Sequence, residues 1–301
     1  MAMAAVYCSG LQYNRFPNAR REVLVLTPPD QPEADRMRDA FDTAAKALDC
    51  QLAPTTQETW SWNGRALAAP VSHKDRTCWL RVTVAPLDAV RGGPSRREAA
   101  ASTISYLAVP RPAFLTSHRW EVGQRGYQAD LEEHLHGHVL SRTALAPHGL
   151  TLSEGWWSQL GTALHAITQT DTEVFAVRPE RVSWVIHQYI GAGAPTDAPW
   201  WDTAHADLHW SNLGGTGSLE ILGWDRWGMA PEYLDAATLY VSSLTEPDLA
   251  DRVRTEFRAE LASQSGRFAL LYVCAEHLHG LERGNHSVLW NPVNRLVRSL
   301  L

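Results

Sequence analysis

The chain has 301 residues, of which 45% are hydrophobic and 20% are charged, and its formal net charge at pH 7 is −6. This length and composition suit a globular protein with one two-lobed domain or two small ones. The acidic balance, with no run of Lys and Arg, excludes a nucleic-acid partner held by phosphate contacts, and no stretch of 18 apolar residues predicts a membrane span.

The cysteines and the first residues indicate the compartment. Cys8, Cys50, Cys78 and Cys274 lie far apart and form no Cys-x-x-Cys motif, so no zinc or redox motif is present. The first ten residues lack the charged start and the long apolar segment of a signal peptide. These features predict a protein of the reducing cytoplasm.

The first 130 residues are predicted to form a small antiparallel sheet with flanking helices. In the strand expected at residues 78–84, Cys78, Leu80, Val82 and Val84 share one face and Arg81 lies on the other. The remaining elements expected here are a strand over 22–27, a helix over 33–48, a strand before a polar turn at 72–76, a helix capped by Ser95 and a hairpin over 120–129.

The rest of the chain is predicted to be mostly helical. A capping-box pattern at 151–154 opens a helix that continues to about residue 168, with Trp156, Leu160, Leu164 and Ile167 as its buried stripe. Further helices are expected over 130–140, 179–190, 231–243, 249–263 and 267–283, with an amphipathic segment over 288–301.

The most informative stretch begins at His205. Asp207 and Asn212 lie five positions apart in a segment too polar for a core strand. A carboxylate in such a loop can accept a hydroxyl proton while an amide oxygen ligates a hard cation. A glycine-rich turn over 214–217 and a short apolar strand over 219–222 follow.

The segment HADLHWSN, residues 205–212, resembles the HGDLHPGN loop of the aminoglycoside phosphotransferase family, relatives of choline kinases and more distantly of protein kinases. The sequence LGWD at 222–225 stands where that family has an I-D-W-E-like tetrapeptide, and Asp235 opens the next helix as a second Asp does in the family. The resemblance is specific over 205–240, moderate over the C-terminal two-thirds and weak before residue 75.

The resemblance implies an α+β, protein kinase-like bilobal fold. It gives a small antiparallel-sheet N-terminal lobe at residues 1–130 and a mostly helical C-terminal catalytic lobe at 131–301. It further implies that Asp207 is the catalytic base, that Asn212 is a Mg²⁺ ligand and that Asp235 is a structural carboxylate.

One position departs from the family pattern. The family's metal-binding Asp falls on Gly223, which has no side chain. Asp225 lies two residues on, and the period of a strand places it on the same face, so it is the candidate substitute ligand.

Lysine is rare in the chain, since only Lys46 and Lys74 are lysines among 27 Lys and Arg residues. Protein kinases hold the nucleotide phosphates with a lysine on the third strand of the small lobe. In the resemblance Arg81 takes that place, with Glu98 as its candidate partner. The alternatives are a surface arginine and a solvated glutamate favoured by the helix dipole.

Thirteen tryptophans are present, and several flank the Asp207 loop. They suit stacking on a planar or cationic ligand, which favours a small-molecule or peptide substrate over a nucleic acid, and core packing is the alternative. The substrate-cleft candidates are His209, Trp201, Trp210, Trp224 and Trp227.

The resemblance implies an enzyme that uses ATP and Mg²⁺ to phosphorylate a hydroxyl group of a small molecule or peptide natural product, such as an antibiotic. The alternative is a kinase-like fold without phosphotransfer. Such a protein would be a pseudokinase with a protein partner, or a repurposed enzyme of a biosynthetic pathway. Gly223 and Arg81 favour this second hypothesis, because they replace a metal ligand and a phosphate-binding lysine.

Overall fold

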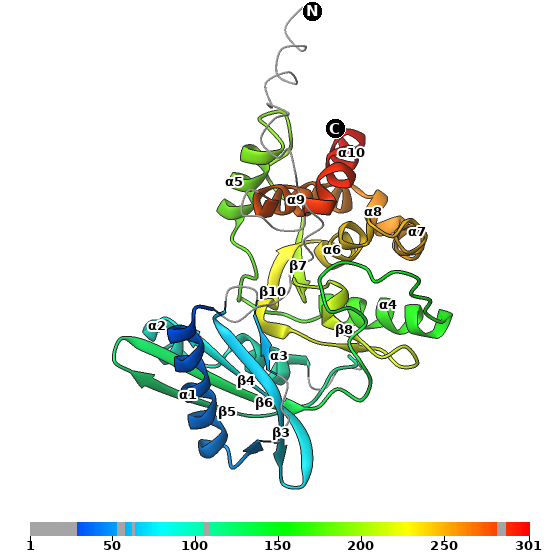
Figure 1. Ribbon diagram of the computed structural model, residues 1–301. Helices are drawn as coiled ribbons and strands as arrows, with labels where there is room; N and C mark the ends of the chain where they lie inside the picture. Colours follow the sequence, from blue (N-terminus) through cyan, green and yellow to red (C-terminus); the bar gives the residue numbers. More distant parts are fainter. Residues whose placement is uncertain (1–28, 53–57, 62–63, 105–106, 108, 282–286) are drawn as a thin grey trace, which may run out of the picture.

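A computed structural model describes residues 29–301 except 53–57, 62–63, 105–106, 108 and 282–286. In these residues an antiparallel sheet is followed by a mostly helical half, as the sequence predicts (Figure 1). The strand expected over residues 22–27 lies outside the described residues. No described helix combines the length and the apolar character that crossing a membrane requires.

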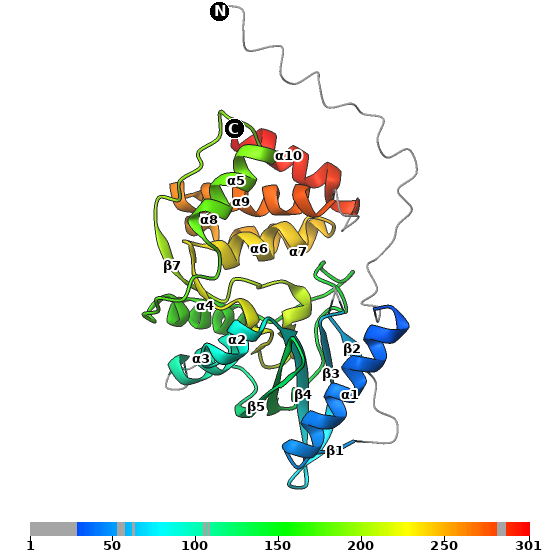
Figure 2. The same cartoon turned by 90° about the vertical axis from the view of Figure 1, so that its left-hand side faces the viewer.

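The sheet has the strand order β1-β3-β4-β6-β5, with β2 also paired to β3, and every pairing is antiparallel. Helix α1 lies on one side of this sheet, and α2 and α3 lie on the other (Figure 2). The elements are α1 (Gln31–Ala47), β1 (Gln51–Leu52), β2 (Thr59–Trp60), β3 (Ala66–His73), β4 (Arg76–Ala85), α2 (Leu87–Arg91), α3 (Arg96–Ile104), β5 (Phe114–Val122) and β6 (Arg125–Glu133).

The alternation predicted for strand β4 is confirmed. Cys78, Leu80 and Val82 are at most 1% exposed and pack in one cluster with Met37 and Phe41 of α1. Because side chains alternate along a strand, Arg81 points to the other side of the sheet, toward α3. One face of β4 therefore builds the core of the sheet region while the other contributes a charged group.

The helix predicted over residues 130–140 is wrong, because β6 continues to Glu133. Asp130 pairs with Arg81 on one side and Ser117 on the other, and Leu131 is fully buried between the same strands. Backbone bonds to two neighbouring strands outweigh the local helical pattern, since β6 is a central strand of the sheet.

The second half contains seven α-helices among its described residues, and those expected near 151–168 and 179–190 are confirmed. The predicted helix over 249–263 is divided at Phe257, which leaves helical geometry while its ring is buried. The helices are α4 (Glu154–Thr168), α5 (Pro179–Tyr189), α6 (Leu234–Ser243), α7 (Pro247–Glu256), α8 (Arg258–Ala262), α9 (Gln264–Leu281) and α10 (Trp290–Leu300). The short strands are β7 (Trp201–Ala204), β8 (Leu213–Gly214), β9 (Glu220–Ile221) and β10 (Gly228–Pro231).

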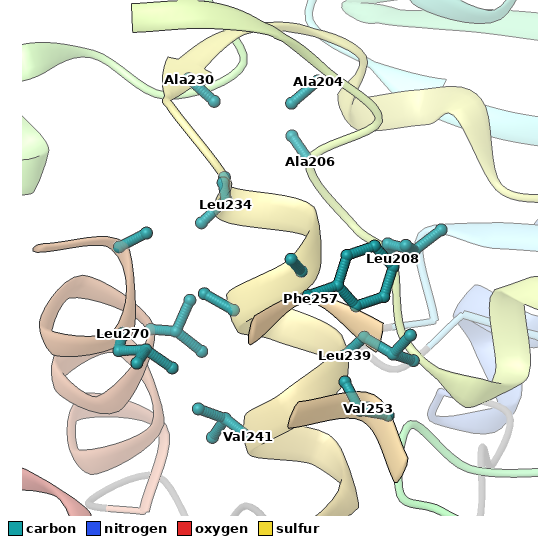
Figure 3. Close-up of a cluster of buried hydrophobic side chains, with 14 of the residues drawn as sticks. Ala204, Ala206, Leu208, Ala230, Leu234, Leu239, Val241, Val253, Phe257 and Leu270 are labelled. Carbon is teal, nitrogen blue, oxygen red and sulfur yellow. The ribbon is translucent and has the colours of Figure 1, made fainter. Parts of the chain in front are cut away.

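The larger hydrophobic core lies directly beneath the polar loop that starts at His205. Leu208 belongs to this loop, is 0% exposed and packs in the same cluster as Leu239, Val253 and Phe257 (Figure 3). One apolar side chain therefore anchors the loop on α6 and α7 while its neighbours remain polar.

We expect Leu208→Ala to lower the free energy of unfolding by about 2–5 kcal/mol, because it leaves a cavity in a fully packed site. Urea unfolding followed by tryptophan fluorescence measures this. Leu115→Ala is the matched control, since Leu115 is 41% exposed and should change stability little. A loss at Leu208 no larger than at Leu115 would contradict this packing.

Candidate active site

The loop that carries Asp207 follows strand β7, which pairs antiparallel with β10. After the loop come a short 3₁₀ turn, Trp210–Asn212, and the β8–β9 hairpin. Strand pairing thus holds both ends of the loop, and the polar side chains project from the segment between the paired strands.

The carboxylate of Asp235, in the first turn of α6, holds the start of the loop. Its two oxygens accept the backbone N–H groups of His205 and Ala206, each at 2.8 Å. Ala206 has φ of +62°, which an L-residue rarely adopts, so these two bonds stabilise a strained turn. Burial raises the pKa of Asp235 to about 6, although both N–H donors favour its charged form.

His205 fixes the loop from below. Its Nε2 donates to the carbonyl of Leu222 at 2.7 Å, and its Nδ1 accepts the backbone N–H of Asp207 at 3.3 Å. The ring is 0% exposed and packs edge-on against Trp224. Burial lowers the pKa of His205 to about 4, so the ring is neutral at pH 7 and can both donate and accept.

Asp207, His209 and Asn212 come together at the open side of the loop. The side chain of Asp207 is 34% exposed, and its Oδ2 lies 3.7 Å from His209 Nε2. Asn212 Nδ2 donates to the Asp207 carbonyl at 2.8 Å and to its Oδ2 at 3.2 Å. A carboxylate is therefore presented to solvent in a fixed orientation.

Gly223 follows β9 with φ of +79°, and its neighbour is the side chain of Asn212. A Cβ atom at this position would lie 2.5 Å from Asn212 Oδ1 and 2.7 Å from its Nδ2. The amide of Asn212 thus fills the space that a side chain at 223 would need.

Asp225 is held by two arginines from the sheet region. Its Oδ2 lies 3.3 Å from Arg81 Nη2 of β4, and its Oδ1 accepts Arg97 Nε of α3 at 3.0 Å. Partial burial of Asp225 opposes its ionisation, but these two cations hold the pKa of Asp225 well below its usual range. Arg97 also pairs with Glu132 of β6 at 2.6 Å.

Solved structures with a similar fold are small-molecule kinases. Aminoglycoside phosphotransferase APH(4)-Ia matches with a TM-score of 0.59 over 88% of this chain and 99% of its own, at 12% identity. Choline kinase LicA from Streptococcus pneumoniae gives 0.52 over 88% and 99% at 9% identity, and a microcompartment-associated aminopropanol kinase gives 0.53 over 87% and 94% at 13%. No protein-family model matches the chain, and neither does any curated protein.

The chain has the protein kinase-like fold of these phosphotransferases. The bilobal α+β fold implied by the HADLHWSN resemblance is therefore confirmed. Arg81 lies on β4 and faces Asp225.

The predicted pairing of Glu98 with Arg81 is wrong. Glu98 lies on the side of α3 that faces β5, where its carboxylate accepts hydrogen bonds from Arg119 and from Ser117. The preceding residue, Arg97, faces the site instead, because consecutive side chains on a helix point about 100° apart. The sequence analysis missed Arg97, and its position beside Glu98 was the only signal.

Three of the tryptophans proposed for a substrate cleft are core residues. Trp210, Trp224 and Trp227 are at most 3% exposed, so a ligand cannot stack on them without opening the core. The indole N–H groups of the first two donate to the Ser243 hydroxyl and to the Ile221 carbonyl, whereas the buried indole N–H of Trp227 has no hydrogen-bond acceptor. Trp201 is half-buried and packs edge-on against Phe175, which is itself 44% exposed.

The residues present do not fit the paired Mg²⁺ ligands that the resemblance implies. Gly223 offers no ligand, and the two oxygens of Asp225 are engaged by arginines. That Asp225 takes over as a ligand stays a prediction. Among the described residues no group of three or more His, Cys, Asp or Glu side chains is arranged to hold a metal ion. The carbonyl oxygen of Asn212 is the one expected ligand atom that the loop retains.

A cavity of about 550 Å³ lies away from this site, between the segment that joins the two halves and the β8–β9 turn. Its charged side chains already have partners, because Glu220 accepts both the backbone N–H and the Nδ1 of His136, and Arg111 donates to the Ala101 carbonyl. The cavity includes none of the residues Asp207, Asn212, Arg81 and Asp225.

Gly223→Ala should lower the free energy of unfolding by about 1–3 kcal/mol, because Ala resists φ of +79° and its Cβ would overlap Asn212. Gly161→Ala is a control of opposite sign. Gly161 lies inside α4 with nothing near its missing Cβ, so Ala there should add about 0.5–1 kcal/mol. Urea unfolding of both variants tests this, and equal effects would refute the close approach at 223.

Asp235→Asn should lower stability, because an amide presents N–H groups to one of the two backbone donors that the carboxylate accepts. We expect a loss of about 1–3 kcal/mol. Asp251→Asn is the control, since the Asp251 side chain is 71% exposed and its ion pair with Arg254 is solvated.

The cost of Asp235→Asn should depend on pH. The pKa of Asp235 is about 6 in the folded protein and about 3.9 in an unfolded chain, so the native state binds more protons between these values. This contribution to stability is complete below pH 4 and is lost as the pH rises through 6. The stability gap between wild type and variant should therefore widen from pH 7 to pH 5, and a constant gap would show that Asp235 does not titrate there.

Proposed function

We propose that this protein binds a nucleoside triphosphate between the sheet and the Asp207 loop and transfers its terminal phosphoryl group to a hydroxyl of a small molecule. Asp207 would accept the hydroxyl proton as the substrate oxygen bonds to phosphorus and the nucleoside diphosphate leaves. Arg81 would contact the phosphates. One of the similar structures, a mutant of the aminoglycoside phosphotransferase, is a complex with ADP and hygromycin B, which supports both ligand classes.

The observation that carries the proposal is the support beneath Asp207. Asp235, His205 and Asn212 fix its backbone and one carboxylate oxygen, while a third of the side chain stays exposed. Phosphoryl transfer depends mostly on positioning and on electrostatic stabilisation, because the protein has little covalent chemistry to perform. A loop that holds one carboxylate in this way is suited to orient an attacking hydroxyl.

On the substrate side, the exposed aromatic groups are candidates. Trp200 is 70% exposed, Phe175 is 44% exposed, and Trp201 lies half-buried beside them at the start of β7. His209 lies 3.7 Å from the Asp207 carboxylate and could contact the bound acceptor. These groups favour an organic acceptor with a planar or cationic part, such as an aminated natural product.

A second function is favoured by Gly223 and Asp225. Without a carboxylate free to hold a second cation, the site loses charge stabilisation that supports phosphoryl transfer. A kinase-like protein that binds a nucleotide and signals to a protein partner would need only the binding. A measurement of phosphate transfer by the wild-type protein distinguishes the two functions, because only the enzyme would form a phosphorylated acceptor.

Asp207→Asn should remain folded and lose about 10²–10⁴-fold in turnover, because its amide cannot accept the hydroxyl proton. Phosphorus NMR can follow ATP, with and without Mg²⁺, in the presence of hygromycin B, choline, aminopropanol and a fructosamine. Asp248→Asn, an exposed residue of α7, is the control.

Transfer by wild type that survives Asp207→Asn would exclude Asp207 as the base. Saturable binding of ATP without transfer to any acceptor would favour the binding function over the enzyme.

A further inference from the structure

Asp225 joins the two halves of the molecule through a chain of charges. Arg81 of β4 and Arg97 of α3 both contact its carboxylate, and Glu132 of β6 contacts Arg97 from behind. The two arginines thus converge on one acidic group beside the Asp207 loop.

The two arginines differ in how firmly they are neutralised. Arg97 has two acidic partners, Asp225 and Glu132, whereas Asp225 is the one ion-pair partner of Arg81 in the described residues. The Nε atom of Arg81 is buried and has no hydrogen-bond acceptor. The Arg81 guanidinium therefore has an N–H donor without an acceptor, and a single ion pair at 3.3 Å, with Asp225, balances its positive charge.

The order of exposure shows which member of the group meets solvent. The side chain of Asp225 is 37% exposed, that of Arg81 is 23% exposed and that of Arg97 is 6% exposed. The carboxylate is the outermost member, and the arginines lie behind it. An anion that approaches from solvent would reach the Arg81 guanidinium at the place where Asp225 now lies.

Carboxylates and phosphates are interchangeable partners of arginine. Both present planar pairs of oxygens to the guanidinium fork, and a phosphate carries more charge. A site in which two arginines bind one carboxylate can therefore also bind a phosphate group.

We propose that Arg81 and Arg97 form a phosphate subsite and that Asp225 is its internal counter-ion, which a bound polyphosphate displaces from Arg81. This inference rests on the proposed nucleotide-binding function. It reverses the expected effect of removing the carboxylate: a metal ligand supports nucleotide binding, whereas a competing counter-ion weakens it.

Asp225→Asn tests this directly, because the variant keeps the shape of the side chain and removes its charge. Calorimetric titration with ATP and with inorganic tripolyphosphate, each with and without Mg²⁺, should show binding about tenfold tighter or more than in wild type. The gain should not need Mg²⁺. Arg81→Gln should weaken the binding of both probes in the wild-type and Asp225→Asn backgrounds.

Glu121→Gln is the matched control. It breaks the ion pair between Glu121 of β5, in the same sheet, and Arg91 of α2, and it should leave both affinities unchanged. If Asp225→Asn fails to fold, Asp225→Ser repeats the test with a side chain that can still accept one arginine N–H.

Weaker or unchanged binding in both Asp225 variants, with ATP still bound by wild type, would overturn the subsite and leave the proposed function standing. Tighter tripolyphosphate binding without any ATP binding would support the subsite and refute the nucleotide-dependent function. If neither probe binds any of the proteins, the subsite is refuted as well.

Discussion

The candidate site depends on one buried carboxylate, that of Asp235, which holds the start of the Asp207 loop. Asp235 accepts two consecutive backbone N–H groups, and these bonds keep Ala206 in a left-handed conformation from which Asp207 turns outward. The cost of that turn is of order 1–3 kcal/mol, which two charge-assisted hydrogen bonds in a buried environment can offset. Burial raises the pKa of Asp235 to about 6, so ionising this carboxylate costs more in the folded protein than in the unfolded chain, and the two N–H donors offset part of that cost.

The histidine beneath the loop and the leucine beside it complete the support by different means. His205 works because it is neutral: a charged ring could not accept the backbone N–H of Asp207, and burial keeps the pKa of His205 near 4. Leu208 fixes the distance between the loop and α6, because its side chain is fully buried against that helix. Polar bonds thus set the direction of Asp207, and apolar packing sets its position.

Much of this could be predicted from the sequence, because the informative residues are local. Asp207, Asn212 and Asp235 lie within one stretch whose order of parts is specific, and the faces of β4 follow from a simple alternation. The role of Arg97 could not be predicted, since three charged residues in a row, Arg96 to Glu98, do not reveal which side of α3 faces the site. The number of tryptophans near the loop also does not show which of them line a cleft and which are core residues. Burial depends on contacts between elements that are distant in sequence, and Trp210 and Trp227 are buried by such contacts.

The departures from the family pattern are physically linked. The amide of Asn212 fills the space that a side chain at Gly223 would need, and Asp225, two residues on, carries a negative charge that faces Arg81. Because Asp225 lies within reach of β4 and α3, that charge attracts two arginines from the sheet region. A lysine at position 81 would supply one point charge, whereas arginine supplies a fork that can hold Asp225 or a phosphate oxygen pair equally well. Gly223 and the arginine of β4 are therefore two parts of one arrangement, in which the guanidinium groups of Arg81 and Arg97 converge on the carboxylate of Asp225.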